Sequence, residues 1–253
     1  MTALDARDPC AAGGSAGVPA AQTEWQTRID LAACYRLCAL HGWDDLIYTQ
    51  ISATLEHDRG VVLVKRPGQR FDEVTASSLI KVAAGNGLHS ALHAGLHPYH
   101  AALHAARPDV GCVMHLHNRH AIAVGMQEHG LLPLSQSALR LYGQVAYHDY
   151  EGAQAGALES ARLVTRLRGR SAMLLRHHGS LVCAPSVAQA FLLMETLDSA
   201  CAIQLMAQAS GTPLHCPAPD VCRQAQADLA GDTALAWAAL LRKLDGVDAR
   251  YRT

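Results

Sequence analysis

The sequence predicts an α/β protein in which helices cover a sheet. Segments with a helical spacing of apolar residues alternate along the chain with short apolar runs, and Gly or Pro often stands between them. Half of the 253 residues are apolar, which is enough to build one sizeable domain with its own core.

Each element is expected for a local reason. Apolar residues recur at helical spacing from residue 24, and Gly42 ends that helix. Pro98 stands at the first position of another helix, where its missing N–H costs nothing. In chain order, we expect helices over 24–41, 75–80, 98–106, 120–127, 156–167, 187–204 and 225–244, and strands over 46–51, 61–64, 110–116, 144–147, 172–175 and 180–183.

The composition divides the chain into three regions. Residues 1–23 are rich in Ala, Gly and Pro, and we expect a disordered tail that folding does not require. Residues 24–210 form the expected α/β domain. Residues 211–253 are expected to be a linker, with three prolines over 211–220, followed by a C-terminal helical arm.

Charge and hydropathy exclude several classes of function. The 21 Lys and Arg residues nearly balance the 22 Asp and Glu residues, so the chain lacks the basic excess of a nucleic-acid binder. No apolar run approaches eighteen residues, which argues against a membrane span, and the N-terminus does not resemble a secretory signal. The eight cysteines form no C-x-x-C pair and are expected to be reduced, so we expect a cytoplasmic protein.

Histidine is unusually frequent, with fifteen residues, and three of them suggest a metal site. His115 and His117 end an apolar strand, where side chains at i and i+2 share one face. His178 stands where another apolar strand stops, before Gly179, and is the best candidate for a third ligand. The alternative is that His115 and His117 are hydrogen-bonded polar residues at the end of a sheet. A ladder of further histidines at steps of three and four could line a pocket, form a solvated face or contact another subunit: His89, His93, His97, His100 and His104.

Six segments, in the same order along the chain, together resemble the class II aldolase/adducin family. They are spread over about residues 26–210, and a C-terminal segment at 237–245 also resembles the bacterial, adducin-like members. The six segments cover residues 42–52, 71–79, 107–117, 130–136, 147–152 and 175–179.

The resemblance implies a fold, a metal and an assembly. It implies a three-layer α/β/α domain around a largely antiparallel sheet, often assembled as a tetramer with sites near subunit interfaces. In the sugar-phosphate aldolases of the family, the positions that match His115, His117 and His178 bind zinc. Such a metal is a Lewis acid that polarises a carbonyl group and stabilises the enediolate formed when a C–C bond breaks.

The chain departs from these aldolases in its metal ligands and in its phosphate contacts, and their Ser-Ser phosphate contact has no clear counterpart near Leu96. Their metal-binding glutamate stands nineteen residues before the first metal histidine, and counting back from His115 gives Leu96, which can neither bind metal nor carry a proton. The Gly-Asn of their phosphate loop is Thr49-Gln50 here. We therefore expect a substrate without a phosphate group.

A different proton carrier is needed if the protein is an enzyme. His97 is adjacent to the lost glutamate position, and Glu151 lies in a segment that resembles the family, so both are candidates for this catalytic role. Either residue could instead have a structural role, and Glu151 could cap the helix that follows.

Three functions remain open. The first is a metal-dependent, aldolase-like lyase acting on a small hydroxy-carbonyl or keto-acid substrate, with Zn favoured and Fe or Mn as alternatives. The second is a non-haem iron oxygenase, because three neutral histidines leave open positions on a ferrous ion. The third is a non-catalytic, adducin-like binding module, although such a module has no chemical need for three converging imidazoles. A small-molecule partner and a homo-oligomer, with a tetramer favoured, accompany the first function.

Overall fold

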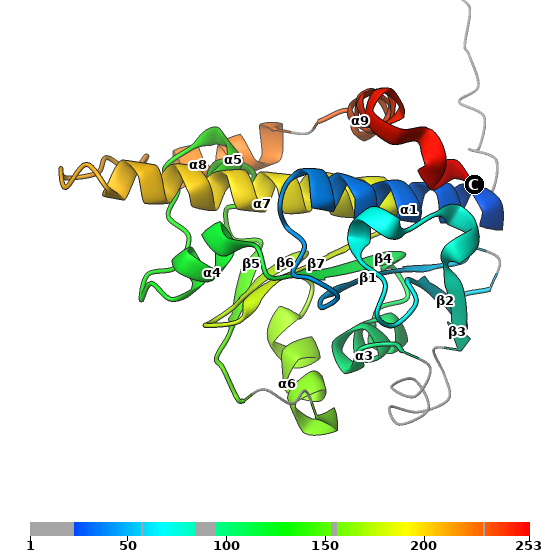
Figure 1. Cartoon of the computed structure of the whole chain (residues 1–253). Helices are drawn as coiled ribbons and strands as arrows, with labels where there is room; N and C mark the ends of the chain where they lie inside the picture. The colour runs from blue at the N-terminus through cyan, green and yellow to red at the C-terminus, as the bar shows by residue number, and fades with distance from the viewer. Residues whose placement is uncertain (1–22, 57, 84–94, 153–155, 230) are drawn as a thin grey trace, which may run out of the picture.

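The computed structural model describes residues 23–56, 58–83, 95–152, 156–229 and 231–253. In these residues, helices lie on both faces of a seven-stranded sheet with the order β3-β2-β1-β4-β7-β6-β5 (Figure 1). Strands β5 and β6 are parallel, and the other neighbouring pairs are antiparallel. This confirms the expected α/β/α architecture with a largely antiparallel sheet. The expected tail lies outside the described residues, except for Thr23, which caps the first helix.

The strands and helices have the following bounds. The strands are β1 (Gln50–Thr54), β2 (Val61–Val64), β3 (Ile80–Ala83), β4 (Cys112–Leu116), β5 (Val145–His148), β6 (Ala172–Leu175) and β7 (Gly179–Ala184). The α-helices are α1 (Glu24–Leu40), α3 (Pro98–Ala106), α4 (Arg119–Gly125), α5 (Gln136–Arg140), α6 (Ala157–Leu167), α7 (Val187–Gln208), α8 (Pro219–Asp228) and α9 (Thr233–Asp248). Short 3-10 turns are η1 (Phe71–Glu73), η2 (Ala76–Ser78) and η3 (Ala249–Arg252).

The two faces of the sheet are covered by different helices. Helices α1, α7 and α9 lie on one face, and α3 and α6 lie on the other (Figure 1). Strand β4 alternates between them: Met114 belongs to the core under α1 and α7, whereas Val113 belongs to the core under α3 and α6. Because side chains at i and i+2 share a face, His115 points to the α3 and α6 side, as Val113 does.

Helix α7 is the central helix of the larger core. By length and composition alone it could cross a membrane, although the sequence contains no long uninterrupted apolar run. In the structure, Phe191 and Met194 of this helix are fully buried among residues of α1 and the sheet. Burial of these two side chains is typical of a helix that packs in a protein core.

Two expected elements differ from the structure, and two observed elements were not expected. The strand expected over 46–51 begins at Gln50, because the chain bends first: Leu46 and Thr49 have left-handed φ angles of 50° and 63°. The short helix expected over 75–80 is a single 3-10 turn, and Ile80 already belongs to β3. Helix α5 and strand β3 were not expected from the sequence.

The C-terminal region also differs from the expectation. One helix was expected over 225–244, but two are present, and Pro219 occupies the first turn of α8 within the expected linker. Helix α9 packs against the domain: the indole of Trp237 donates a hydrogen bond of 3.2 Å to Asp30, and Arg36 pairs with Asp248 at 2.9 Å. The domain boundary at residue 210 stays a prediction.

Candidate metal site

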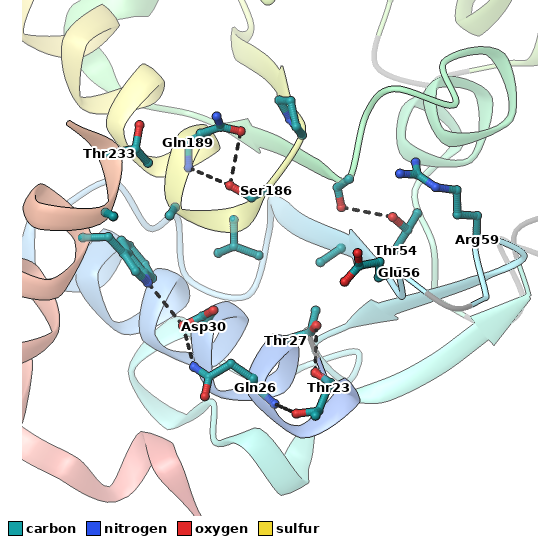
Figure 2. Close-up of a pocket in the computed structure, with 17 residues that line it drawn as sticks. Thr23, Gln26, Thr27, Asp30, Thr54, Glu56, Arg59, Ser186, Gln189 and Thr233 are labelled. Carbon is teal, nitrogen blue, oxygen red and sulfur yellow. Dashed lines mark hydrogen bonds between the residues drawn. The ribbon is translucent and has the colours of Figure 1, made fainter. Parts of the chain in front are cut away.

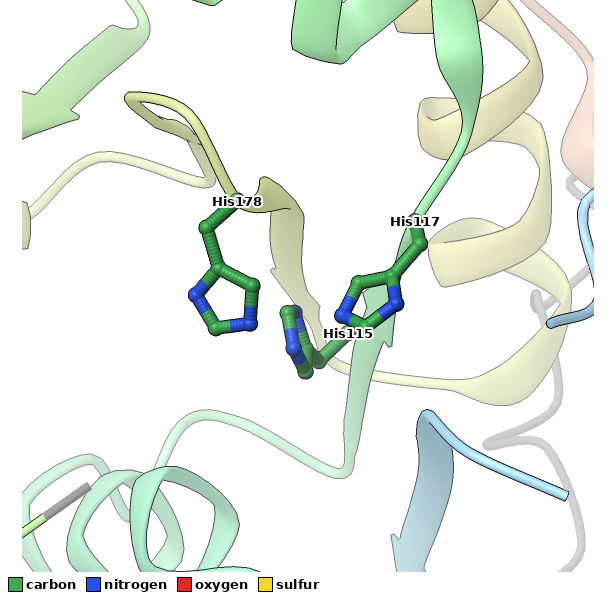
Figure 3. Close-up of side chains that lie close together, drawn as sticks. All are labelled: His115, His117 and His178. Atoms are coloured by element: carbon green, nitrogen blue, oxygen red, sulfur yellow. The ribbon is translucent and has the colours of Figure 1, made fainter. Parts of the chain in front are cut away.

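Three histidine rings converge at one end of the central strands. His115 is in β4, His117 lies one residue beyond its end, and His178 lies in the turn between β6 and β7 (Figure 3). One ring nitrogen from each lies within 4.8 Å of the other two, and the ring centroids are 4.8–5.2 Å apart. The sequence analysis selected these three residues, and the structure brings them together.

The fold explains this convergence. Strand β4 pairs with β7, so Leu116 lies opposite Ser180 and the β6–β7 turn lies beside the end of β4. His177 adopts a left-handed φ of 61°, which turns the chain immediately before β7. A Cβ at Gly179 would collide with the backbone carbonyl oxygen of Leu116, so the close approach of the turn to β4 requires glycine.

Hydrogen bonds orient two of the rings. Nδ1 of His115 donates to the backbone oxygen of Ser180 at 3.0 Å, and Nδ1 of His117 donates to Asp45 at 2.8 Å. In a neutral imidazole with its proton on Nδ1, Nε2 is an unprotonated acceptor. The partner of His117, Asp45, was missed by the sequence analysis because it lies at the start of a bend, just before the strand expected over 46–51.

Burial favours the neutral form of two of these rings, His115 and His178. Desolvation lowers the pKa of His115 well below its usual range, and the neighbouring His178, His97 and His117 lower it further. Burial also lowers the pKa of His178. Since neutral imidazole is the metal-binding form, these three converging rings, two of them oriented by hydrogen bonds, fit a divalent ion with nitrogen ligands.

The three histidines open into a cavity of about 470 Å³. Its wall includes Lys65 and Arg66, and no Asp or Glu lines it in the described part of the chain. The Lys65 ammonium donates to the backbone oxygen of Ile47 at 2.8 Å, and burial lowers its pKa. Arg66 has no ion-pair partner among the described residues. The cavity therefore presents cationic and neutral groups to a ligand.

His97 and the neighbouring Leu96 both line this cavity, and Leu96 is fully buried in a cluster of apolar side chains. His97 caps α3, and its Nδ1 accepts a hydrogen bond of 3.3 Å from the backbone N–H of Tyr99. Its ring centroid lies 5.8 Å from that of His115. Burial lowers the pKa of His97 to about 4, so the ring is neutral near pH 7.

Gln50 fixes the segment that contains Leu96 and His97. Its side-chain amide donates to the backbone oxygen of Gly95 at 2.7 Å and accepts from the backbone N–H of His97 at 2.9 Å. Both ends of the amide are therefore used within the protein. This role was not evident from the sequence, because it depends on a contact between residues 45 positions apart.

Glu151 does not line the cavity. It forms an ion pair with Arg162, which holds the pKa of the Glu151 carboxyl below its usual range, and it lies 3.6 Å from Nε2 of His148. It does not cap the next helix, since Gly156 is the N-cap of α6. A catalytic role for Glu151 stays a prediction.

Of the histidine ladder, the structure describes His97 at the N-cap of α3 and His100 and His104 within that helix. His100 and His104 point into the interior, where Nδ1 of His100 lies 2.6 Å and Nε2 of His104 lies 2.8 Å from the hydroxyl of Ser52. His89 and His93 lie outside the described residues.

A larger cavity, of about 940 Å³, lies near the N-terminal ends of α1 and α9 (Figure 2). None of the predicted site residues lines it. Its polar side chains bond to one another: Asp30 accepts from Gln26 at 3.1 Å and from the indole of Trp237 at 3.2 Å. The smaller cavity, which contains the converging histidines, is therefore the candidate site.

A sheet covered on both faces by helices, with three converging histidines at strand ends, is the arrangement expected of a class II aldolase-type protein. Residues 29–205 match the family model of the class II aldolase and adducin N-terminal domain. The chain therefore belongs to this family.

Relatives and solved structures agree with this assignment. A Pseudomonas aeruginosa protein, provisionally named an aldolase class 2 protein, is 45% identical over 242 residues, covering 90% of this chain and 93% of that protein. Rat alpha-adducin is 37% identical over 204 residues, which are 78% of this chain but 28% of adducin.

Among solved structures, an aldolase II superfamily protein from Pseudomonas syringae has 38% identity and a TM-score of 0.84, covering 93% of this chain and 98% of that one. The L-fuculose 1-phosphate aldolase from Glaciozyma antarctica has 21% identity and a TM-score of 0.77, covering 91% of this chain and 93% of that one. At that identity it shows the fold alone.

Proposed function

We propose that the protein is a metal-dependent, aldolase-like lyase that acts on a small, non-phosphorylated hydroxy-carbonyl or keto-acid substrate. The observation that supports this most directly is the convergence of His115, His117 and His178 on one cavity. The 45% identity to a protein provisionally named as a class 2 aldolase supports the same reaction type.

The three histidines would hold a divalent ion, with Zn favoured and Fe or Mn as alternatives. A bound ion supplies a Lewis acid that polarises a substrate carbonyl group. The protein's own contribution is orientation: Ser180 and Asp45 fix two of the imidazoles through Nδ1. Leu96 contributes no ligand, so the described part of the chain offers three protein ligands rather than four.

The cavity wall favours an anionic substrate, and a carboxylate rather than a phosphate. Lys65 and Arg66 supply positive charge. Gln50, which occupies part of the family's phosphate loop, uses both ends of its amide to hold the backbone at Gly95 and His97. Of the two proposed substrate types, a hydroxy-carbonyl compound and a keto acid, these contacts favour the keto acid.

His97 is the better placed of the two proposed proton carriers. It lines the cavity, and because its Nδ1 accepts a backbone hydrogen bond, the proton of the neutral ring is on Nε2. From that atom it can donate a hydrogen bond to a reacting group, and it would accept a proton at Nδ1 once that atom leaves the backbone N–H of Tyr99. Glu151 stays the second candidate.

A non-haem iron oxygenase is the alternative enzyme, since three neutral histidines and no carboxylate at the Leu96 position suit an open ferrous site. An adducin-like binding module is the non-catalytic alternative, supported by the 37% identity to alpha-adducin.

Hydrogen exchange at a carbonyl-adjacent carbon separates these functions. Protein loaded with Zn or Mn is incubated with pyruvate in anaerobic D₂O, and methyl-proton loss is followed by NMR. The lyase proposal expects metal-dependent exchange that His178→Ala abolishes. Oxygen uptake with Fe and no exchange would instead identify the oxygenase, and the absence of both, across a panel of keto acids, would leave the binding module.

Arg66→Gln tests the proposed substrate charge. Loss of a charge-assisted hydrogen bond should weaken pyruvate binding about tenfold and leave binding of the neutral hydroxyacetone unchanged. Arg70→Gln is the control, since Arg70 is paired with Asp72 and does not line the cavity. Titration calorimetry on metal-loaded protein measures both ligands. Equal pyruvate affinity in Arg66→Gln and the native protein would contradict an anionic substrate at this wall.

We further propose a cytoplasmic homo-oligomer, with a tetramer favoured, whose partner is a small molecule rather than a nucleic acid or a membrane. The near balance of 21 basic and 22 acidic residues supports the exclusion of nucleic acid. Light scattering coupled to size-exclusion chromatography gives the subunit number.

A further inference from the structure

Asp198, in the middle of α7, is a buried carboxylate that accepts hydrogen bonds from three side chains. Asp198 is 7% exposed, and no Lys or Arg lies within ion-pair distance of it in the described part of the chain. It accepts hydrogen bonds from the indole of Trp43 at 3.1 Å, from the amide of Asn118 at 2.9 Å and from Nδ1 of His120 at 3.0 Å. A buried carboxylate is costly unless such donors surround it.

Asn118 connects Asp198 to the strand that bears two of the histidines. It directly follows His117 and is the N-cap of α4, yet its side chain makes no capping hydrogen bond. Its amide instead donates to Asp198, and its oxygen accepts from the hydroxyl of Ser180 at 2.6 Å. An asparagine at this position ordinarily caps its helix, so the bridge replaces a local contact.

Ser180 continues the connection to the other histidines. It is fully buried, stands two residues after His178, and lies opposite Leu116 in the β4–β7 pairing. Its backbone oxygen is the acceptor that orients Nδ1 of His115. One chain of hydrogen bonds therefore runs from Asp198 through Asn118 and Ser180 to both segments that carry the histidines.

We propose that Asp198 is a positioning residue for the three-histidine site, acting through Asn118 and Ser180. The inference rests on the proposed function, because it assumes that the histidines bind a metal. Residues behind metal ligands commonly change metal affinity by 10–100-fold when they are removed. Asp198 would act in this way from a helix that contributes no ligand.

The polarity of the bridge makes a specific variant informative. In Asp198→Asn, the side-chain oxygen can still accept from Trp43 and His120, while the new NH₂ group points toward Asn118. The Asn118 amide can then flip, so that its oxygen accepts from residue 198 and its NH₂ donates to the Ser180 hydroxyl. The bridge survives with its direction reversed, whereas Asp198→Ala removes it.

The experiment measures the affinity for Zn²⁺ by competition with a chromophoric chelator, and the visible absorption spectrum of the Co²⁺-loaded protein. We expect Asp198→Ala and Asn118→Ala each to weaken Zn²⁺ binding at least tenfold and to change the Co²⁺ spectrum. Asp198→Asn should stay within about twofold of the native protein, and the double alanine variant should bind no more weakly than the weaker single variant. Glu195→Ala, an exposed change on the same helix, is the control and should have no effect.

The possible results are distinguishable. If the native protein binds Zn²⁺ and His178→Ala does not, but folded Asn118→Ala and Asp198→Ala bind as tightly as the native protein, this inference is wrong and the metal site stands. Losses that multiply in the double variant would also overturn it, since they indicate independent effects. If the native protein binds neither Zn²⁺ nor Co²⁺, the metal site and this inference both fail. Asn118→Ser replaces Asn118→Ala if circular dichroism shows the latter to be unfolded.

Discussion

At the residue scale, two histidines beside the candidate site have a structural role in the interior. His100 and His104 flank the hydroxyl of the fully buried Ser52 between β1 and α3. Nε2 of His100 has no hydrogen-bond partner among the described residues. Burial therefore disfavours protonation of both rings, and it lowers the pKa of His104 to about 4 and that of His100 well below its usual range.

This burial predicts a loss of stability in acid. An unfolded histidine has a pKa of 6.5, so below that pH the unfolded chain binds a proton that the folded protein does not. The free energy of unfolding should therefore fall as the pH drops from 6.5 toward 4, and His104 alone should account for about 2 kcal/mol between pH 7.5 and 5. Urea unfolding at the two pH values measures this loss.

His104→Asn provides the comparison. It should be less stable than the native protein at pH 7.5, because Ser52 loses a partner, but its stability should fall less toward pH 5. The same pH dependence in both proteins would show that His104 does not titrate on unfolding.

The sequence identified the rings at the candidate site but not the groups that orient them. His115, His117 and His178 could be selected because strand periodicity and the family resemblance both mark them. Asp45 could not, since its contact with His117 depends on the left-handed bend before β1. Asp198 lies 80 residues after Asn118, and no local pattern connects the two.

At the element scale, the turn between β6 and β7 positions His178. Because a Cβ at residue 179 would collide with the Leu116 carbonyl oxygen, Gly179→Ala should push the turn away from β4. We expect a loss of about 2 kcal/mol of unfolding free energy and a reduced metal content. Urea unfolding and elemental analysis measure the two effects.

Gly169→Ala is the matched control, since a Cβ at that turn residue meets nothing within 4 Å. It should leave both quantities near their native values. If Gly179→Ala is as stable and as metal-rich as the control, the close packing of the turn does not matter for the site.

Element boundaries were harder to predict than element types. Strand β1 was expected four residues early, because Leu46 and Ile47 are apolar but lie exposed in the bend. The C-terminal segment was expected to contain one helix, although Pro219 starts α8 at a position where proline is favourable. In both cases apolar spacing was visible, whereas the turn between elements depended on tertiary contacts.

At the scale of the whole molecule, the C-terminal arm packs on the main domain. Trp237 of α9 is 7% exposed, packs against Phe191 of α7 at a centroid distance of 5.8 Å, and bonds to Asp30 of α1. Tyr251 of the final turn is fully buried. These contacts join the arm to both helices that cover the same face of the sheet.

Trp237→Ala should therefore destabilise the whole protein. Loss of a large buried aromatic side chain predicts a decrease of about 3 kcal/mol in unfolding free energy, within a single cooperative transition. Trp25→Ala is the control, because Trp25 is 48% exposed, and it should cost about 0.5 kcal/mol or less. Two separate transitions in calorimetry would instead show that the arm folds as an independent unit.

The most direct test of the proposed function is the metal content of the purified protein, compared with His115→Ala and His178→Ala. Elemental analysis should find about one divalent ion per chain in the native protein and almost none in either variant, since each removes one of three ligands. Zinc or manganese would favour the lyase, and iron the oxygenase. A native protein without metal, even after incubation with Zn²⁺, Mn²⁺ or Fe²⁺ under anaerobic conditions, would contradict the three-histidine metal site and favour an adducin-like binding module.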